Sequence, residues 1–111
     1  MSRDERERLR DIRDAIVAIR KHLARAGEAR GGGDALLHDA LLFQFVVIGE
    51  AVKNVASETR ESAPEIPWAD VAGLRDLIAH EYFRIDIERV LEIVERDVPP
   101  LEQAIDRLLG E

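Results

Sequence analysis

The chain has 111 residues, of which 46% are hydrophobic and 35% are charged, and it contains no cysteine. These values suit one compact helical domain, residues 1–111, and exclude disulfides, thiolate catalysis and cysteine-bound zinc. The net charge of −7 argues against a general nucleic-acid coat, because such binding depends on cations that neutralise phosphates. The N-terminus has no secretory signal and the longest apolar run is too short to span a bilayer, so we expect a cytoplasmic protein with no membrane partner.

Charge is distributed unevenly along the chain. Residues 1–30 carry nine Arg or Lys and six Asp or Glu, a net charge of +3. The remaining 81 residues carry seven against seventeen, a net charge of −10. Any anion-binding site must therefore be local, or the first helix must lend it positive charge. A solvated face of mixed charge is the simpler interpretation of that helix.

The first half of the chain predicts two long helices. In residues 3–29 apolar side chains recur every three or four positions, which indicates an amphipathic helix with one buried stripe. Gly31-Gly32-Gly33 should end it, and Asp34 is placed to cap a second helix that reaches about Ser57. Within residues 41–55 apolar side chains occupy nearly every side, so we expect this helix to be central, covered by its neighbours and by another subunit.

The second half predicts two more helices and a short final one. Residues 57–67 indicate a loop with at most a frayed helical turn, and Pro67 suits the first position of a third helix, which should carry the apolar residues up to Ile78. Asp86 can cap a fourth helix, which Pro99-Pro100 should stop or kink before a short helix to Leu109. No strand pattern or internal repeat is present. The prediction is an all-α up-and-down bundle of four main helices plus a short C-terminal helix.

The stretch Leu74–Phe83, with the sequence LRDLIAHEYF, holds the residues best suited to chemistry. Arg75 presents a planar fork of donors to a phosphate, and His80 exchanges protons near neutral pH. Asp76, one helical turn before His80, could fix which ring nitrogen carries the proton. Tyr82 shares a face with Arg75, whereas His80 lies roughly 140° around an ideal helix from Arg75.

One metal-independent reaction uses these properties together, the attack of a ribose 2′-hydroxyl on its own phosphodiester. It needs a base, an acid and a cation that stabilises the phosphorane. One His80 cannot conveniently supply both base and acid in one step, whereas two copies in a twofold dimer could. The residues alone leave open a purely structural role, because the Arg-to-His pattern is short and such helical pairs contribute only about 0.2–0.5 kcal/mol.

The same stretch resembles the signature of the HEPN superfamily of all-α proteins, in which an arginine, a polar residue and a histidine follow in this order. More specifically, GLRDLIAHEYF, together with IGEAVKNV at 48–55 and PW at 67–68, resembles the HepT-like family of toxins. The resemblance runs across nearly the whole chain. It implies the toxin of a type VII-like toxin–antitoxin pair, encoded beside a small MntA-like nucleotidyltransferase.

The resemblance also implies roles for individual residues. Arg75 and His80 would be catalytic in a metal-independent, cofactor-free endoribonuclease that cleaves RNA across a homodimer cleft. Asp76 would be the polar member of the motif, where many relatives have asparagine, and Tyr82 would receive AMP from the antitoxin. We expect the modified protein to be inactive, because the added phosphate is negative. The alternative function is a non-catalytic helical binding partner of a nucleotidyltransferase.

Glu50 is a charge within the most apolar helix, where it is costly unless it is paired. We expect a buried salt bridge or hydrogen bond to a neighbouring helix, and the sharper alternative is that Glu50 supports catalysis by orienting Arg75 or His80.

Two histidine features and one tryptophan complete the candidates for a functional role. His38 with Asp39, and His22 in the first helix, could hint at metal ligands, but their spacing is unlike that of known metal sites, so no metal site is predicted. Trp68 is expected to pack in the core or an interface, since no interleaved aromatic and basic pattern accompanies it.

Overall fold

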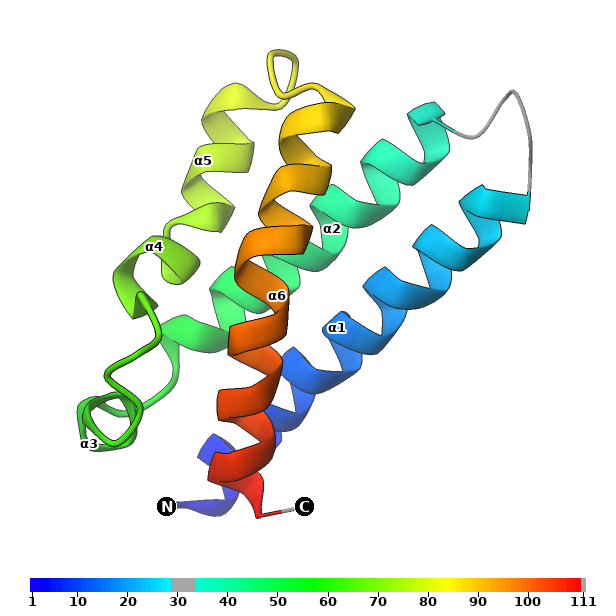
Figure 1. Cartoon of the computed structure of the whole chain (residues 1–111). Helices are drawn as coiled ribbons and strands as arrows, with labels where there is room; N and C mark the ends of the chain where they lie inside the picture. Colours follow the sequence, from blue (N-terminus) through cyan, green and yellow to red (C-terminus); the bar gives the residue numbers. More distant parts are fainter. Residues whose placement is uncertain (29–33, 111) are drawn as a thin grey trace.

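The computed structural model describes residues 1–28 and 34–110, and all regular structure in this part of the chain is helical (Figure 1). Its helices are α1 (Arg3–Glu28), α2 (Asp34–Lys53), α3 (Ser57–Glu61), α4 (Trp68–Ala72), α5 (Leu74–Glu81) and α6 (Ile87–Leu109). Helices α1, α2, α5 and α6 alternate in direction, and both termini lie at the same end of the bundle. The predicted all-α up-and-down bundle is confirmed.

Helix α2 lies at the centre of the bundle, as predicted, and contacts α1, α4, α5 and α6. It begins at Asp34, whereas the predicted terminator Gly31–Gly33 falls outside the described residues. Its buried side packs against the apolar stripe predicted for α1, and each such side chain contributes roughly 1.5–3 kcal/mol when it leaves water. The fully buried members of the two helices are Leu9, Ile12, Ile16, Ile19, Leu41, Phe45, Ile48 and Val52.

Among the described helices, α2 is also the one that is long and apolar enough, over Ala35–Lys53, to cross a membrane by length and composition. The central helix of a soluble protein meets the same criterion, and α2 has four helical neighbours. The radius of gyration is 14.2 Å, close to the roughly 13 Å typical of a compact chain of this length. The structure is consistent with a soluble protein.

A short helix, α3, occupies the segment where a loop with a frayed turn was predicted. Its N-cap residue, Ala56, has no side chain that can accept a hydrogen bond. The buried carboxylate of Glu5, from α1, caps the helix instead. Glu5 accepts from the Ala56 N–H at 3.1 Å and from the Thr59 hydroxyl. A cap supplied from a distant helix leaves no local sequence signal, which is why α3 was not predicted.

The structure divides the predicted third helix into two, α4 and α5 (Figure 1). Gly73 is the C-cap residue of α4 and the N-cap residue of α5, and its φ is −72°. A glycine is a frequent site of such a break, because its backbone is less restricted than that of other residues. Trp68, at the start of α4, is buried, and its indole N–H donates to the carbonyls of Arg60 and Ala63. The prediction that Trp68 belongs to the core is confirmed.

Helix α6 begins as predicted, because the Asp86 carboxylate accepts a hydrogen bond from the Arg89 N–H at 2.9 Å. The prediction that Pro99-Pro100 separates it from a short final helix is wrong, since α6 continues through both prolines to Leu109. Each proline removes the hydrogen bond to the carbonyl four residues earlier. Those carbonyls belong to Glu95 and Arg96, which are exposed, so water can satisfy them while the opposite face stays packed in the core.

Candidate active site on helices α2 and α5

Helix α5 packs antiparallel to the last turns of α2, and Gly49 sets how closely they approach. A Cβ built on Gly49 would lie 3.0 Å from the Arg75 backbone nitrogen and 3.3 Å from the Ala72 carbonyl oxygen. No other residue type fits this space without moving the backbone of α5. The Gly49 contact therefore positions the start of α5, and with it Arg75, against α2.

Arg75 is held by Glu50, the residue that follows this glycine. The Arg75 Nε lies 3.0 Å from Glu50 Oε2, and the two side chains remain 49% and 55% exposed. The expectation that Glu50 is buried is wrong, because the side of α2 that carries it faces the short helix α5 and an open hollow toward α1 and is not covered by a long helix. The ion pair uses one of the five N–H donors of the guanidinium and leaves the others for an anion.

Asp76 contacts cations rather than His80. Its Oδ1 lies 3.5 Å from Lys53 Nζ at the end of α2 and 3.9 Å from Arg75 Nη1. Two positive charges therefore compensate the carboxylate, which reduces its repulsion of an incoming phosphate. Sequence reasoning missed Lys53, because only the antiparallel packing of α5 on α2 brings it to Asp76.

His80 lies on the same unbroken helix as Arg75 and is exposed. Among the residues that the structure describes, none forms a hydrogen bond or ion pair with its side chain. The ring is therefore open to proton exchange with solvent or with a bound molecule. Because five positions separate it from Arg75, the two side chains still leave α5 roughly 140° apart. One chain thus presents the arginine and the histidine on different faces.

Tyr82 follows α5 and also turns toward α2. Its hydroxyl donates a hydrogen bond of 2.8 Å to Asp39 Oδ1, and its side chain stays 40% exposed. Arg75 and Tyr82 both contact α2, in agreement with the shared face predicted for them. The hydrogen bond to the Asp39 carboxylate, together with its negative charge, raises the pKa of Tyr82 above its ordinary value of 10.0.

His38 lies beside both Asp39 and Tyr82. Its Nε2 lies 2.5 Å from the Ile85 carbonyl oxygen and its Nδ1 lies 3.5 Å from Asp39 Oδ1. The His38 and Tyr82 rings meet edge to face with centroids 6.3 Å apart. Sequence reasoning considered His38 and Asp39 only as metal ligands, and no local signal links them to a tyrosine 43 positions away. The described residues contain no group of three or more potential metal ligands.

The pKa of Tyr82 can be measured directly, because it is the chain's only tyrosine. We expect the ultraviolet absorbance of its phenolate to appear above the ordinary pKa of 10.0, and Asp39→Asn to lower the midpoint because the acceptor loses its charge. Since the folded-state pKa is the higher one, the contact stabilises the fold below pH 10.0 and is lost as pH rises through the folded pKa. Equal midpoints in both proteins would contradict this contact.

Gly49→Ala should displace α5. We expect the new Cβ, 3.0 Å from the Arg75 nitrogen, to lower the free energy of unfolding by about 1–3 kcal/mol and to weaken the Arg75–Glu50 pair. Chemical denaturation measures the first effect. Gly73→Ala is the matched control, because its φ of −72° suits alanine and its Cβ would meet only carbonyls of its own preceding turn at 3.3 and 3.4 Å. Equal stability losses in both variants would contradict the role given to Gly49.

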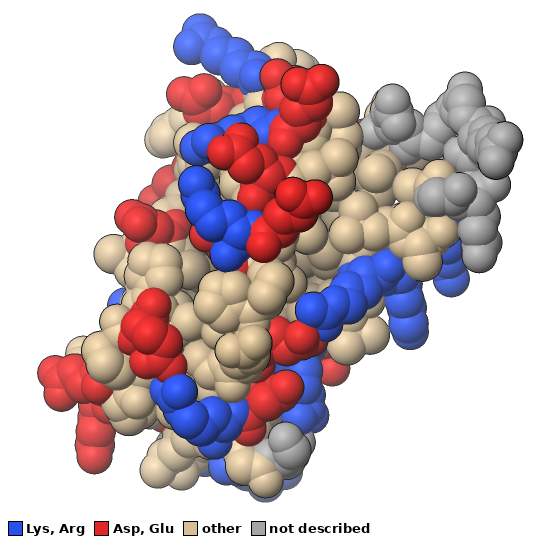
Figure 2. Space-filling view, in the orientation of Figure 1, with Lys and Arg blue, Asp and Glu red and all other residues tan. Residues whose placement is uncertain are grey.

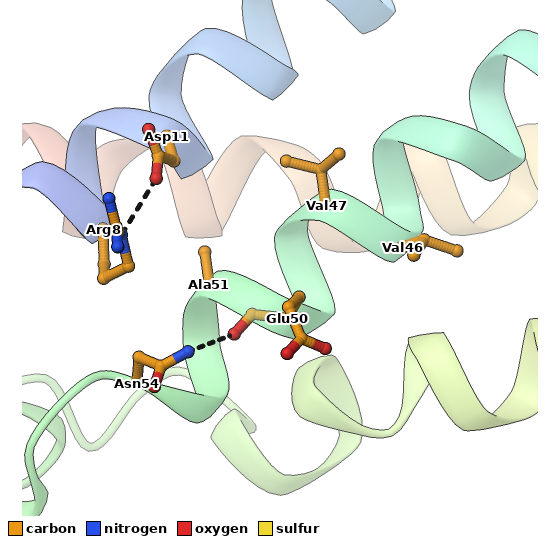
Figure 3. A pocket seen from close by; sticks show the side chains of 7 residues that line it. All are labelled: Arg8, Asp11, Val46, Val47, Glu50, Ala51 and Asn54. Carbon is orange, nitrogen blue, oxygen red and sulfur yellow. Dashed lines mark hydrogen bonds and ion pairs between the residues drawn. The ribbon is translucent and has the colours of Figure 1, made fainter.

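One side of α2 next to this site carries apolar residues that the bundle does not cover. Leu36 is 76% exposed and Phe43 64%, and Val46 and Val47 are half-buried. The last two line a hollow of about 380 Å³ between α1 and α2 (Figure 3). The Glu50 backbone carbonyl accepts from Asn54 at the same hollow. The uncovered apolar face of α2 therefore leads to the Arg75–Glu50 pair.

The surface charge does not form a field of one sign on the face shown in Figure 2, where acidic and basic side chains are intermixed. The same holds at the site, where the cations Arg75 and Lys53 stand beside the carboxylates Glu50 and Asp76. An anion would thus be attracted by the local geometry of donors rather than by overall charge.

An all-α up-and-down bundle with an arginine and a histidine five residues apart on one helix has the features of a HEPN domain. The chain belongs to the HepT-like family, whose model, described as ribonuclease HepT-like, matches residues 12–108.

Curated relatives support the same assignment. “Probable ribonuclease HepT” of Thermococcus cleftensis is 31% identical over 97% of this chain and 98% of the relative. “Gamma-glutamylcyclotransferase and putative RNase” of Methanocaldococcus jannaschii is 32% identical over the whole chain, which spans 50% of that relative's length. “Putative RNase” of Caldanaerobacter subterraneus subsp. tengcongensis is 37% identical over 68% of each chain. No solved structure matches the chain.

Proposed function

We propose that this chain is the toxin of a type VII-like toxin–antitoxin pair, a cytoplasmic, metal-independent endoribonuclease that acts as a homodimer. The observation that carries the proposal is the state of Arg75 and His80. The Arg75 guanidinium is fixed by Glu50 yet half exposed, and the His80 imidazole on the same helix is exposed and has no partner among the described residues. An oriented cation and a free acid–base group are what RNA transesterification requires.

The chemistry uses each residue at a stated atom. A neutral His80 ring nitrogen takes the proton of the ribose 2′-hydroxyl, whose oxygen attacks the adjacent phosphorus. The terminal nitrogens of Arg75 stabilise the charge that develops on the phosphorane oxygens. A protonated His80 from the second chain gives a proton to the departing 5′-oxygen. The products are a 2′,3′-cyclic phosphate and a 5′-hydroxyl.

The dimer supplies the second histidine. Because Arg75 and His80 leave α5 on different faces, one chain offers half a site. The uncovered face of α2, with Leu36 and Phe43 exposed, ends beside Glu50 and Arg75. Burying this apolar face between two chains would remove it from water and bring the two copies of the site together.

The antitoxin is proposed to be a MntA-like nucleotidyltransferase that attaches AMP to Tyr82. Tyr82 is 40% exposed, and it lies on the side of α5 that carries Arg75. A phosphodiester there adds negative charge near the arginine, competes with the RNA phosphate and so lowers activity. Modified and unmodified proteins that cleave RNA equally well would contradict this part of the proposal.

The alternative is a non-catalytic helical partner of the nucleotidyltransferase. Two carboxylates, Glu50 and Asp76, lie within 4 Å of basic groups of Arg75 or Lys53, so the site has no excess of positive charge. That observation favours a docking surface over an RNA site. This alternative predicts a stable complex with the transferase and no RNA cleavage.

The deciding experiment combines expression and cleavage. We expect the unmodified chain alone to arrest growth when expressed, and the purified dimer to cleave RNA in the presence of EDTA. Co-expression of the nucleotidyltransferase should restore growth and add the mass of AMP to Tyr82. Absence of both toxicity and cleavage, with a stable transferase complex, would support the alternative. Cleavage that disappears in EDTA would contradict the metal-independent mechanism.

A further inference from the structure

His38, Asp39 and Tyr82 form a connected group that the cleavage chemistry does not use. The Tyr82 hydroxyl donates a hydrogen bond of 2.8 Å to Asp39 Oδ1. The Asp39 side chain is 60% exposed, so this hydrogen bond lies at the surface, where a second protein can reach it. The phenol of Tyr82 is thus oriented by a carboxylate and still accessible.

His38 lies beside that carboxylate and is itself fixed in place. The Ile85 carbonyl can only accept a hydrogen bond, so Nε2, at 2.5 Å, carries the proton. This leaves Nδ1 facing Asp39 Oδ1 at 3.5 Å, a contact that is attractive when the ring carries its second proton. The His38 side chain is only 17% exposed, so its position is fixed by packing as well as by the Ile85 carbonyl. When it carries its second proton, the fixed imidazole therefore restrains Asp39 against the tyrosine.

We propose that Asp39 is the general base for nucleotidylation of Tyr82 and that His38 is its positioning residue. The inference rests on the proposed function, which makes Tyr82 the residue modified. The Tyr82 oxygen attacks the α-phosphorus of a nucleoside triphosphate held by the transferase, and a new O–P bond forms. The bond from that phosphorus to the pyrophosphate oxygen breaks and the electron pair leaves with pyrophosphate. The phenolic proton passes to Asp39 and then to solvent.

The physical role of Asp39 has two opposing parts. In the resting protein its charge stabilises the neutral phenol, so the fraction of phenolate, the better nucleophile, is reduced. During attack the phenol becomes much more acidic as its oxygen bonds to phosphorus, and the carboxylate is already at hydrogen-bonding distance to receive the proton. A base and a mere structural contact therefore predict opposite effects when Asp39 loses its charge.

The test is the initial rate of AMP addition by a MntA-like nucleotidyltransferase with ATP and Mg²⁺, followed by intact mass. If Asp39 is the base, we expect Asp39→Asn to slow modification by about 10²-fold or more, even though it raises the phenolate fraction of Tyr82. If the contact is only structural, Asp39→Asn should react at the wild-type rate or faster, which would overturn the inference. Asp106→Asn, an exposed aspartate on α6, is the matched control and should react as the wild type does.

His38 needs a readout that a general loss of stability would not reproduce. We expect His38→Phe to slow modification, and His38→Gln to recover part of the rate because its amide can donate to the Ile85 carbonyl. Equal rates in both variants, at equal thermal stability, would overturn the positioning role.

Failure of the inference and failure of the proposed function are distinguishable. If the wild type accepts AMP and Asp39→Asn accepts it equally fast, only the role of Asp39 is rejected. If the wild type accepts no AMP, the proposed modification is rejected and the inference falls with it. The absorbance titration of Tyr82 needs no transferase, and an unchanged midpoint in Asp39→Asn would also overturn the inference, because the two side chains would then not be in contact in solution.

Discussion

Replacing His80 with alanine is expected to reduce RNA cleavage by about 10²–10⁴-fold, the usual contribution of a positioned acid–base group. The loss of cleavage rate should lie at the upper end of this range, because one substitution removes both the base and the acid from a twofold dimer. Stability should change by no more than about 0.5 kcal/mol, since the side chain is exposed and has no partner among the described residues. Cleavage of a labelled RNA in EDTA measures the rate, and thermal unfolding measures stability.

His22→Ala is the matched control for this experiment. His22 is a half-buried histidine on α1, and replacing it removes the same chemical group from a different helix. We expect cleavage by this variant to remain within a factor of a few of the wild type. Mixed dimers add a second test: because both histidines act in one cleavage, a dimer of one His80→Ala chain and one wild-type chain should also lose most of its activity. Full cleavage by the His80→Ala homodimer would reject His80 as the acid–base group.

Replacing Arg75 with alanine is expected to lower cleavage by about 10²–10³-fold, comparable to the loss of one donor that stabilises a developing oxyanion. Arg75→Lys should be intermediate, because it keeps the charge but loses the planar fork that contacts two oxygens. Neither variant should lose much stability, since the Arg75–Glu50 pair is half exposed, and such pairs contribute about 0–1 kcal/mol.

The control for Arg75 is Arg89→Ala. Arg89 is also exposed and also has a carboxylate neighbour, Glu92 at 3.9 Å, but it lies on α6. We expect its removal to leave the cleavage rate nearly unchanged. A similar loss in both arginine variants would indicate a general effect of positive charge on RNA binding rather than a specific role of Arg75.

The helices were largely predictable because their signals are local. The apolar periodicity of α1, the cap at Asp86 and the apolar character of α2 each depend on residues close together in the sequence. The two errors in helix boundaries were also local in origin. Glycine is tolerated within many helices, whereas a pair of prolines ends most helices. The residue types alone therefore do not show that the chain breaks its helix at Gly73 and continues it through Pro99-Pro100.

The candidate site was predictable only in part. Arg75, Asp76, His80 and Tyr82 are close in sequence, and their grouping on one short segment could be read directly. Their partners on α2 could not, because Lys53 and Asp39 reach them only through tertiary packing. The exposure of Glu50 also depends on which helices pack beside α2, so the sequence alone did not show it.

Glu50 also changes how RNA binding should depend on salt. In the free protein the Glu50 carboxylate already contacts one edge of the Arg75 guanidinium. An RNA phosphate must therefore displace this carboxylate or share the guanidinium with it. Fewer condensed counterions are then released than the arginine count of the site would suggest, and the affinity should fall less steeply as salt rises. Selectivity in such a site comes from how well a phosphate fits the guanidinium edge that Glu50 leaves open, with long-range attraction contributing little.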